Sequence, residues 1–498
     1  MRRWLCLIAA MLCVLSATGC SRPAGESAPV SEGEVPVQEQ ESPATFAVAY
    51  SKDDTLNPYA AATEANLNLA GLLYDSLTVI DGAFMPRLSL AGTVESTDAT
   101  HLEATLRPGA VFSDGTPVQV SDVLASFHAA KASQHYKALL SNVTAAKADT
   151  RTGVITFTLV AADPQAAACL SFPIYMARSA TTAKGEAPTG SGPYVLMREE
   201  GTVYLARNKR WQGAGLYDRV ELRHLPNSES MYYGLASQDI TYYYNDLNTG
   251  DIPRVTASSA AVDMNALVFL GVNGGREPLK IPAVRQALSL LVDRSTLASA
   301  TYSGWAKAAT LPFHPAWEPV TAITGVSATR DLAAALERLA SAGYGTGAGQ
   351  KKLSLELICS ADGNYRTATA QLIRSELESA GIKLVVTPLP YADYKKRLAS
   401  GNYDLYLGEV RLSANMDLSP LLPGGNAGYG VPGDSPTVTA WRGYREGTVT
   451  VEAFTEAFLK DMPYIPLCWR CGFAAYDRRL SVVTPHGYAP YYDFVSWK

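Results

Sequence analysis

Few residues in the chain have types and spacings that could do covalent chemistry. Cys468 and Cys471 have the Cys-x-x-Cys spacing of a redox or zinc pair, but neither a second pair nor a histidine cluster follows them. The 6 histidines are scattered, no His-Glu-x-x-His metal motif occurs, and Gly-Ser-Gly at 190–192 lacks the spacing of a nucleophile elbow. These patterns favour structural thiols or one disulfide over redox or zinc chemistry, and they argue against a secreted hydrolase.

The residues best suited to contact a bound molecule are aromatic. Tyr242, Tyr243, Tyr244 and Asn245 form the most unusual local sequence in a chain with 27 tyrosines. On a strand, alternation puts Tyr243 on the face opposite to Tyr242 and Tyr244, so at least one face is aromatic. A tyrosine ring can stack on a ligand while its hydroxyl stays hydrated. Packing in a core explains the run equally well.

Periodicity in the C-terminal half predicts the elements that would position such residues. Apolar and polar residues alternate at 353–359, a helical repeat then ends at Gly381, and an apolar stretch follows at 382–386. A helix with Leu332, Leu336 and Leu339 on one face precedes this unit, and 403–410 has the pattern of a further strand. Strands that alternate with helices favour a mostly parallel sheet.

The N-terminal half has a different pattern. Residues 44–260 contain short predicted strands such as 154–160 and 220–225, separated by Gly and Pro turns, which favours a mixed α/β arrangement. Ser121 is the expected N-cap of a helix. Farther along, Pro282 begins a helix whose apolar stripe is Val284, Ala287, Leu288 and Leu291.

The first residues are typical of an exported protein. Arg2 and Arg3 precede an apolar run at 4–15 that is too short to span a bilayer, so we expect a signal peptide at 1–19. Small residues directly before Cys20 resemble the lipobox at which bacterial lipoproteins are lipidated and cleaved. An ordinary cleavable signal with an incidental cysteine is the alternative, and Ala17, where the lipobox usually has Leu, speaks for it.

Composition bounds the remainder of the chain. Residues 20–43 are rich in Pro and Glu with almost no large apolar side chain, which predicts a lipidated, disordered tether. About 455 further residues exceed one hydrophobic core and favour two or three lobes. The formal charge of −5 and the absence of a basic patch give no support to nucleic-acid binding.

A series of strings in one order resembles the family 5 extracellular solute-binding proteins, which serve oligopeptide, dipeptide and nickel ABC importers. The strings cover nearly the whole mature chain. They are Thr-Leu-Asn-Pro-Tyr at 55–59, Leu-Tyr-Asp-Ser-Leu at 73–77, Leu-Arg-Pro-Gly-Ala-Val-Phe-Ser-Asp-Gly-Thr-Pro at 106–117, Val-Ser-Asp-Val at 120–123, Pro-Thr-Gly-Ser-Gly-Pro-Tyr at 188–194, Asn-Lys-Arg-Trp at 208–211, and Pro-Ala-Val-Arg-Gln-Ala-Leu-Ser-Leu-Leu-Val-Asp-Arg at 282–294.

The resemblance implies an α/β fold of the bilobal, type II periplasmic-binding-protein class with an extra inserted domain and mixed sheets flanked by helices. It implies a monomer that closes around a small-molecule ligand, most simply a short peptide, and meets an ABC permease in the membrane, with no cofactor and no metal of its own. The implied domains are domain I at 44–72, 181–268 and 479–498, domain II at 73–180, and domain III at 269–478.

Peptide binders of this family pair with the main chain of the ligand, as an added strand does. Aligned on the motifs, Ala61, Ala62 and Thr63 fall where the family offers main-chain partners from one lobe. The stretch at 409–413 falls where the other lobe offers them. The resemblance therefore implies that these segments, including Glu409, Arg411, Leu412 and Ser413, face each other across the ligand.

One departure from the family concerns the charge of the ligand. Peptide binders carry an aspartate for the free amine of the peptide at the position of Ser413. A buried ammonium without a counter-charge would cost several kcal/mol. Either Asp417 or Glu409 substitutes, or the ligand lacks a free amine. Arg411 could pair with a ligand carboxylate or form a surface ion pair.

The family register also places several aromatic residues near the pocket. These are the run at 242–245, Tyr136, Tyr391 and Trp469. Two other functions within the binding class stay open: capture of a nickel or other metal chelate, and capture of an oligosaccharide. A third alternative, from a different class, is a receptor for a peptide signal.

Overall fold

The structure is a computed structural model that describes residues 45–213, 217–247 and 257–497. The predicted signal peptide, the lipidation site Cys20 and the predicted tether lie outside the described residues. Among the described residues, no helix combines the length and the apolar character that crossing a bilayer requires.

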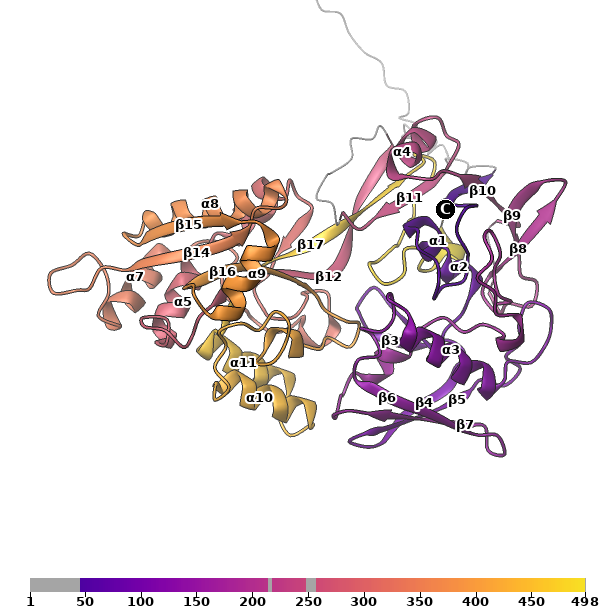
Figure 1. The fold of residues 1–498 in the computed structure, drawn as a ribbon, viewed down its shortest axis with the longest axis horizontal. Helices are drawn as coiled ribbons and strands as arrows, with labels where there is room; N and C mark the ends of the chain where they lie inside the picture. The colour runs from indigo at the N-terminus through magenta and orange to yellow at the C-terminus, as the bar shows by residue number, and fades with distance from the viewer. Residues whose placement is uncertain (1–44, 214–216, 248–256, 498) are drawn as a thin grey trace, which may run out of the picture. The chain divides into compact units, whose positions relative to one another are not determined.

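An 11-stranded mixed sheet is the largest element (Figure 1). Its strands, in spatial order, are β15 (Lys383–Leu389), β14 (Ser354–Ser360), β16 (Leu405–Arg411), β12 (Ser258–Val272), β17 (Tyr464–Tyr476), β11 (Tyr242–Asn245), β1 (Phe46–Tyr50), β10 (Arg219–His224), β9 (Thr202–Arg207) and β8 (Tyr194–Glu199), and β13 (Ala306–Ala308) pairs with β17.

Buried apolar residues form three main cores. Core A contains Phe46, Leu222, Tyr242 and Trp497 and draws on both ends of the described chain. Core B lies between Leu77 and Met176. Core C contains most buried apolar residues from Leu267 to Trp469. The distribution agrees with the size argument for more than one hydrophobic core.

The long strands β12 and β17 run from core A to core C (Figure 1). They pair antiparallel along almost their whole lengths, and an irregularity between Asp263 and Ala266 separates the two halves of the ladder. Val262 and Ala474, on one side of it, belong to core A. Leu267 and Trp469, on the other side, belong to core C. A pair of continuous strands therefore connects the two cores.

Core C contains the strand-helix-strand unit that periodicity predicts. β14 and β15 pair in parallel and flank α8 (Asn364–Glu378), and Gly381 ends this helix region with a φ of +81° that favours glycine. The predicted parallel pairing is present here, because β14 lies parallel to both β15 and β16. β12 lies antiparallel to β16 and β17, so the sheet as a whole is mixed.

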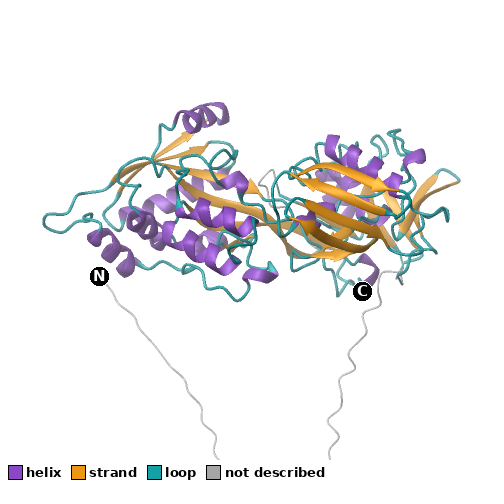
Figure 2. Cartoon of the chain, turned by 90° about the horizontal axis from the view of Figure 1, so that it is seen from below, coloured by secondary structure: helices purple, strands orange, loops and turns teal. Residues whose placement is uncertain are grey.

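The other helices of this part pack around the same strands. Figure 2 shows helices stacked against the strands, as an α/β fold requires. α7 buries Ala335 and Leu339, whereas Leu332 and Leu336 are 37% and 39% exposed, so the predicted stripe is only partly buried. The helices are α5 (Pro282–Leu291), α6 (Arg294–Thr296), α7 (Leu332–Ser341), α9 (Tyr391–Ser400), α10 (Pro436–Arg445) and α11 (Val451–Asp461), with short helical turns at Leu297–Thr301, Glu318–Val320 and Ser419–Leu421.

Core B is built on a separate antiparallel sheet and one helix. The sheet order is β4 (Ala91–Asp98), β5 (His101–Leu106), β7 (Val154–Leu159) and β6 (Val143–Asp149). α3 (Val120–Ala132) begins after Gln119, not after Ser121 as predicted, because Asp122 Oδ2 accepts a hydrogen bond from the Gln119 N–H at 2.9 Å. Short turns follow at Ala166–Leu170 and Ala177–Ser179.

A small hairpin connects the core B region to core C. β2 (Thr78–Ile80) and β3 (Pro86–Leu88) pair antiparallel. Phe84, in the turn between them, belongs to core C and lies 4.7 Å from the ring of His314. Core A is completed by α2 (Ala70–Leu73) and the turn Phe494–Ser496. The buried apolar residues of α1 (Glu64–Asn68) and α4 (Ser228–Ala236) belong to a separate small cluster that also contains Tyr243.

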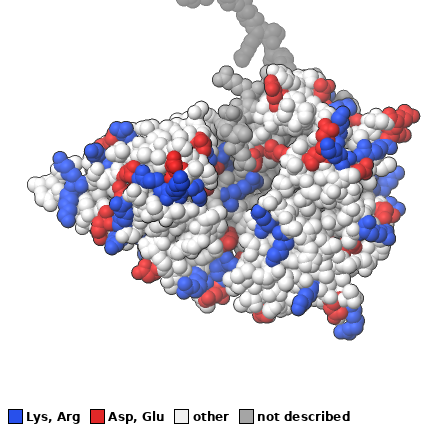
Figure 3. All heavy atoms as spheres, viewed as in Figure 1, with Lys and Arg blue, Asp and Glu red and all other residues white. Residues whose placement is uncertain are grey.

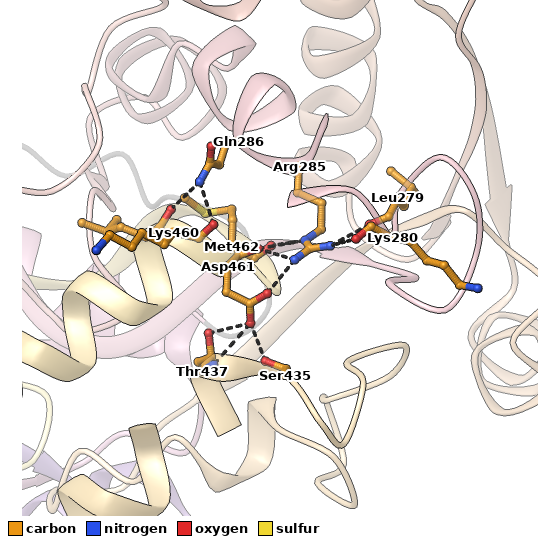
Figure 4. A network of polar contacts seen from close by, with 10 residues as sticks. Leu279, Lys280, Arg285, Gln286, Ser435, Thr437, Lys460, Asp461 and Met462 are labelled. Carbon is orange, nitrogen blue, oxygen red and sulfur yellow. Dashed lines mark hydrogen bonds and ion pairs between the residues drawn. The ribbon is translucent and has the colours of Figure 1, made fainter. Parts of the chain in front are cut away.

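A buried ion pair holds three helices of core C together (Figure 4). Arg285 of α5 donates to the Leu279 carbonyl at 2.8 Å and to Asp461 Oδ1 at 2.6 Å. Asp461, at the end of α11, accepts from Thr437 Oγ1 of α10 at 2.8 Å through its other oxygen. Every charge in the group thus has several partners, as burial demands. Arg285 belongs to the string at 282–294, which has a structural role at this position.

Candidate functional site

A pocket of about 1930 Å³ is lined by residues from the regions of all three cores. On the face drawn in Figure 3, both basic and acidic atoms lie along the hollow of the surface. The pocket brings together many residues that the sequence singled out. These are Ala62, Tyr136, Tyr244, Asn245, Arg411, Leu412, Ser413 and Asp417.

The remaining predicted residues lie elsewhere. Thr63, Tyr242 and Tyr243 line a smaller pocket of about 160 Å³. Tyr391 is 58% exposed at the start of α9, and Trp469 is fully buried in core C. Glu409, like Tyr391 and Trp469, is not among the described residues that line either pocket.

Most main-chain N–H and C=O groups of the segment at 61–63 already form hydrogen bonds within the protein. The N–H groups of Ala62 and Thr63 donate to Asp54 Oδ2 at 2.9 and 2.8 Å. The Ala61 carbonyl lies 3.0 Å from His135 Nε2, and the Thr63 carbonyl accepts from the Leu67 N–H. Burial alone would raise the pKa of Asp54, but the hydrogen bonds from Thr63, Ala62 and Thr55 lower it. A ligand carbonyl cannot use these two N–H groups without displacing a stable carboxylate.

The segment at 409–413 differs, because one edge of its strand extends past its neighbour. β14 pairs with β16 at Leu405 and Tyr406, and β16 continues to Arg411. On the other edge, the Leu412 N–H donates to the Asn265 carbonyl at 2.8 Å. Main-chain groups of successive residues in a strand point to opposite edges. The N–H and C=O of Arg411 therefore point away from β12, toward the edge that extends past β14.

Neither acid that was expected to replace the family aspartate is free of a protein cation. Glu409 accepts from Arg470 at 2.6 Å and from Arg366 at 3.3 Å. Asp417 Oδ1 accepts from Arg445 at 3.0 Å. Each carboxylate already has the partner that a ligand ammonium would need to replace.

Among the acidic residues of the pocket lining that were not predicted from the sequence as ligand-binding, Glu64 and Asp246 lie next to each other. Glu64 follows the segment at 61–63, and Asp246 follows the tyrosine run. Glu64 Oε1 accepts from the Asp246 N–H at 3.3 Å, and Asp246 Oδ2 lies 3.3 Å from Arg411. Burial and the Asp246 carboxylate raise the pKa of Glu64 to about 7. Only one feature of the sequence indicates these acids: each directly follows a segment, 61–63 or 242–245, that the family resemblance places near the ligand.

Alternation along β11 is as predicted. Tyr242 packs in core A, lies 4.8 Å from the ring of Trp497, and donates to the Pro490 carbonyl at 2.8 Å. Tyr243 faces the other way, into a separate small cluster of buried residues. Tyr244 is on the same face as Tyr242 but at the pocket.

The cysteines of the described residues are free and buried. Burial raises the pKa of Cys471 to about 12, and the pKa of Cys468 is also raised well above its ordinary value. The reactive thiolate is therefore disfavoured at both positions. In the described part of the chain, histidine, cysteine and acidic side chains form no group of the size that holds a metal ion.

Comparison with known sequences gives a family match. The model of the bacterial extracellular solute-binding proteins, family 5 Middle, matches residues 83–426. Heme-binding protein A of Haemophilus influenzae is 25% identical over 331 residues, which are 61% of this chain and 59% of that protein. The oligopeptide-binding protein AppA of Bacillus subtilis is 22% identical over 426 residues, 78% of this chain and 76% of its own length. The chain thus spans about three fifths of the heme-binding relative.

Solved structures share the fold at lower sequence identity. The unliganded open form of the periplasmic murein tripeptide binding protein MppA has a TM-score of 0.72 at 15% identity, with 89% of this chain and 96% of that one covered. A nickel ABC transporter structure from Bacillus halodurans has a TM-score of 0.74 at 18% identity, with 90% and 98% covered. The predicted bilobal, type II α/β fold is confirmed.

The family match confirms the prediction that the chain is a binding protein and not an enzyme. The chain belongs to the bacterial extracellular solute-binding proteins of family 5, the extracytoplasmic solute-capturing components of ABC importers.

Proposed function

We propose that the protein captures short peptides in the large pocket and delivers them to an ABC permease. The strand edge of β16 carries this proposal. It presents main-chain groups at Arg411 beside a pocket that Arg411, Leu412 and Ser413 line. A peptide that pairs there gains hydrogen bonds that do not depend on its sequence, which suits an importer of many peptides.

The dimensions of the pocket support a peptide of several residues. Ligand pockets for small molecules typically have volumes of about 300–1,000 Å³. The volume here, about 1930 Å³, leaves space for side chains and for water that bridges them to the wall. Two relatives bear names that speak of peptides, the oligopeptide-binding AppA and the murein tripeptide binding MppA.

The proposed site differs from the one expected from sequence. It keeps Ala62, Tyr136, Tyr244, Asn245, Arg411, Leu412, Ser413 and Asp417, which line the pocket. It leaves out Thr63, Tyr242, Tyr243, Tyr391, Glu409 and Trp469. Strand pairing would come mainly from β16, because the N–H groups of Ala62 and Thr63 bind Asp54.

The proposal includes attachment to the outer face of the cytoplasmic membrane through a lipid on Cys20 and a tether at 20–43. It also keeps the three domains at 44–72 with 181–268 and 479–498, at 73–180, and at 269–478. The separate cores A, B and C support this division. Metabolic labelling with a fatty-acid analogue, compared between the wild type and Cys20→Ala, tests the anchor.

Main-chain pairing can be tested on both sides of the contact. Peptides in which one amide is N-methylated lack one donor, and we expect one or two positions to lower affinity by about tenfold. Arg411→Pro removes the outward N–H of the strand while its neighbours keep their bonds to β12. Arg411→Ala is the matched control, because it loses the same side chain and keeps the N–H. Equal affinities of the two variants would contradict the strand-pairing proposal, provided both melt as cooperatively as the wild type.

Other ligand classes are outcomes of a parallel screen. Calorimetry with short peptides, nickel–histidine, hemin and oligosaccharides should give binding only with peptides. A ligand present at about 100 times its Kd stabilises the fold by about 2.7 kcal/mol, which melting detects readily. Stabilisation by a metal chelate, by hemin or by a sugar, with no effect of peptides, would replace the peptide proposal. An adjacent permease and ATPase in the genome would support uptake over reception of a signal.

A further inference from the structure

One wall of the pocket carries two carboxylates, Glu64 and Asp246, near the guanidinium of Arg411. Asp246 Oδ2 lies 3.3 Å from Arg411, and Glu64 Oε1 accepts from the Asp246 N–H at 3.3 Å. Arg411 also donates to the Gly487 carbonyl at 2.9 Å.

Tyr244 adds an unused hydrogen-bonding group to this wall. Its side chain is 5% exposed and lines the pocket. Its hydroxyl is fully buried and has no hydrogen-bond partner among the described residues. Burial raises the pKa of Tyr244, with smaller effects from Arg411, Asp246 and Glu64, so the hydroxyl lies beside these charges and stays protonated. A buried hydroxyl without a partner is unfavourable, and a hydrogen-bond donor on the ligand would remove that cost.

The described residues that line the pocket carry more negative than positive side chains. Acidic residues outnumber arginines among the residues that line it. The acids are Glu64, Asp75, Glu229, Asp246, Asp417 and Asp493, and the arginines are Arg411 and Arg445. Such a lining attracts cations and repels anions before any contact forms.

We propose that Glu64, Asp246 and Tyr244 form a subsite for a positively charged group of the ligand, an ammonium above all. The inference rests on the proposed capture of peptides. The acids that bind the free amine of the peptide would then lie beside β11, in the core A region, and not at the position of Ser413. The acids considered from sequence, Asp417 and Glu409, keep their arginine partners.

The subsite makes binding depend on pH. Glu64 has a pKa of about 7, so it is largely protonated in mildly acidic solution and ionised above neutrality. The charged and titratable groups that face Glu64 are Asp246 after β11, Arg411 at the end of β16 and Tyr244 on β11. The adjoining segments carry two further acids: Asp54, which accepts from the Thr63 N–H, and Glu229 of α4, which lines the same pocket. A bound ammonium favours the ionised carboxylate. In the pH range below neutrality, affinity for cationic ligands should therefore increase as the pH is raised, by up to about tenfold for each pH unit.

The experiment compares ammonium sources on otherwise identical probes. Short alanine peptides are measured by calorimetry as the free amine, as the N-acetyl form, and as the N-acetyl form with one lysine. We expect the free amine to bind at least about tenfold more tightly than the N-acetyl form. Recovery of affinity by the lysine peptide would identify a side-chain ammonium as an alternative source.

Variants separate the subsite from the pocket in general. Glu64→Gln keeps the acceptor for the Asp246 N–H, and it should abolish both the preference for free amines and the pH dependence. Glu95→Gln, on exposed β4, removes the same charge elsewhere and should behave like the wild type. Equal affinity of free and N-acetyl peptides for the wild type would overturn the subsite and leave peptide capture standing. Failure of every peptide to bind would overturn both proposals.

Discussion

The guanidinium of Arg411, at the end of β16, lies 3.3 Å from the carboxylate of Asp246, directly after β11. β16 contributes to core C and β11 to core A. The ion pair therefore links the end of a core C strand to the end of a core A strand in the lining of the pocket. Its arginine side chain is 43% exposed, so water screens the pair and its net stabilisation is at most about 1 kcal/mol. The pair matters more for binding than for stability, because both of its charged groups line the pocket in which a ligand would bind.

Removal of Arg411 should strengthen the binding of cationic peptides. Arg411→Ala removes the guanidinium that lies beside Asp246 and Glu64, so the two carboxylates attract a ligand ammonium more strongly. We expect affinity for free-amine peptides at about pH 8 to rise several-fold, while the free energy of unfolding changes by less than about 1 kcal/mol. Calorimetry and urea denaturation measure the two quantities. Weaker binding that depends on the carboxylate of the peptide would show instead that Arg411 holds that carboxylate.

The stability of the apo protein should record the raised pKa of Glu64. The carboxyl titrates at about 7 in the folded chain and near 4.5 when unfolded. Its contribution is fully present below the unfolded pKa and is lost as the pH rises through the folded one. Glu64→Gln has no carboxyl to titrate. Between about pH 4.5 and 7, its free energy of unfolding should therefore increase relative to that of the wild type by up to about 1.4 kcal/mol for each pH unit. A difference between the two proteins that is constant with pH would contradict the assignment.

His314 should make the fold sensitive to acid. Burial lowers the pKa of His314 to about 4, against the ordinary 6.5. The folded state keeps the ring neutral, so its contribution is present above about pH 6.5 and is lost as the pH falls toward 4. His314→Asn retains an acceptor for the Ala316 N–H and should show a flatter decline. Because His486 has a similar shift and the buried carboxyls act in the opposite direction, the test is the difference between variant and wild type.

The buried pair of Arg285 and Asp461 should be costly to break. Asp461→Ala leaves the guanidinium of Arg285 without its counter-charge, which costs about 3–5 kcal/mol. Lys460→Ala is the neighbouring control, because its ion pair with Glu456 is exposed and its loss should cost less than about 1 kcal/mol. Urea denaturation measures both variants. A similar loss in the two would contradict the structural role of the buried pair.

The sequence predicted the elements of core C because helices and half-buried strands leave a clear period. The strand that periodicity placed before α8 and the glycine that ends this helix are both present. β17 shows the limit of this reasoning. All of its residues except the last are buried, so alternation cannot tell a core face from a pocket face, and Trp469 proved to belong to core C.

The charged wall of the pocket was beyond the reach of sequence reasoning for a different reason. Glu64, Asp246 and Arg411 lie far apart in the chain, and they meet only because β11 and β16 are set in one sheet by the long strands between them. The resemblance marked the neighbouring segments but not the two acids. Their pairing and the raised pKa of Glu64 follow from tertiary contacts and burial, which no local pattern encodes.

Native mass spectrometry of the protein purified without added ligand tests the central proposal most directly. We predict a complex that releases intact short peptides on denaturation, with free amines and varied sequences. Glu64→Gln should carry less peptide than the wild type and Glu95→Gln the same amount. A released metal chelate, tetrapyrrole or sugar in place of peptide would contradict the proposal.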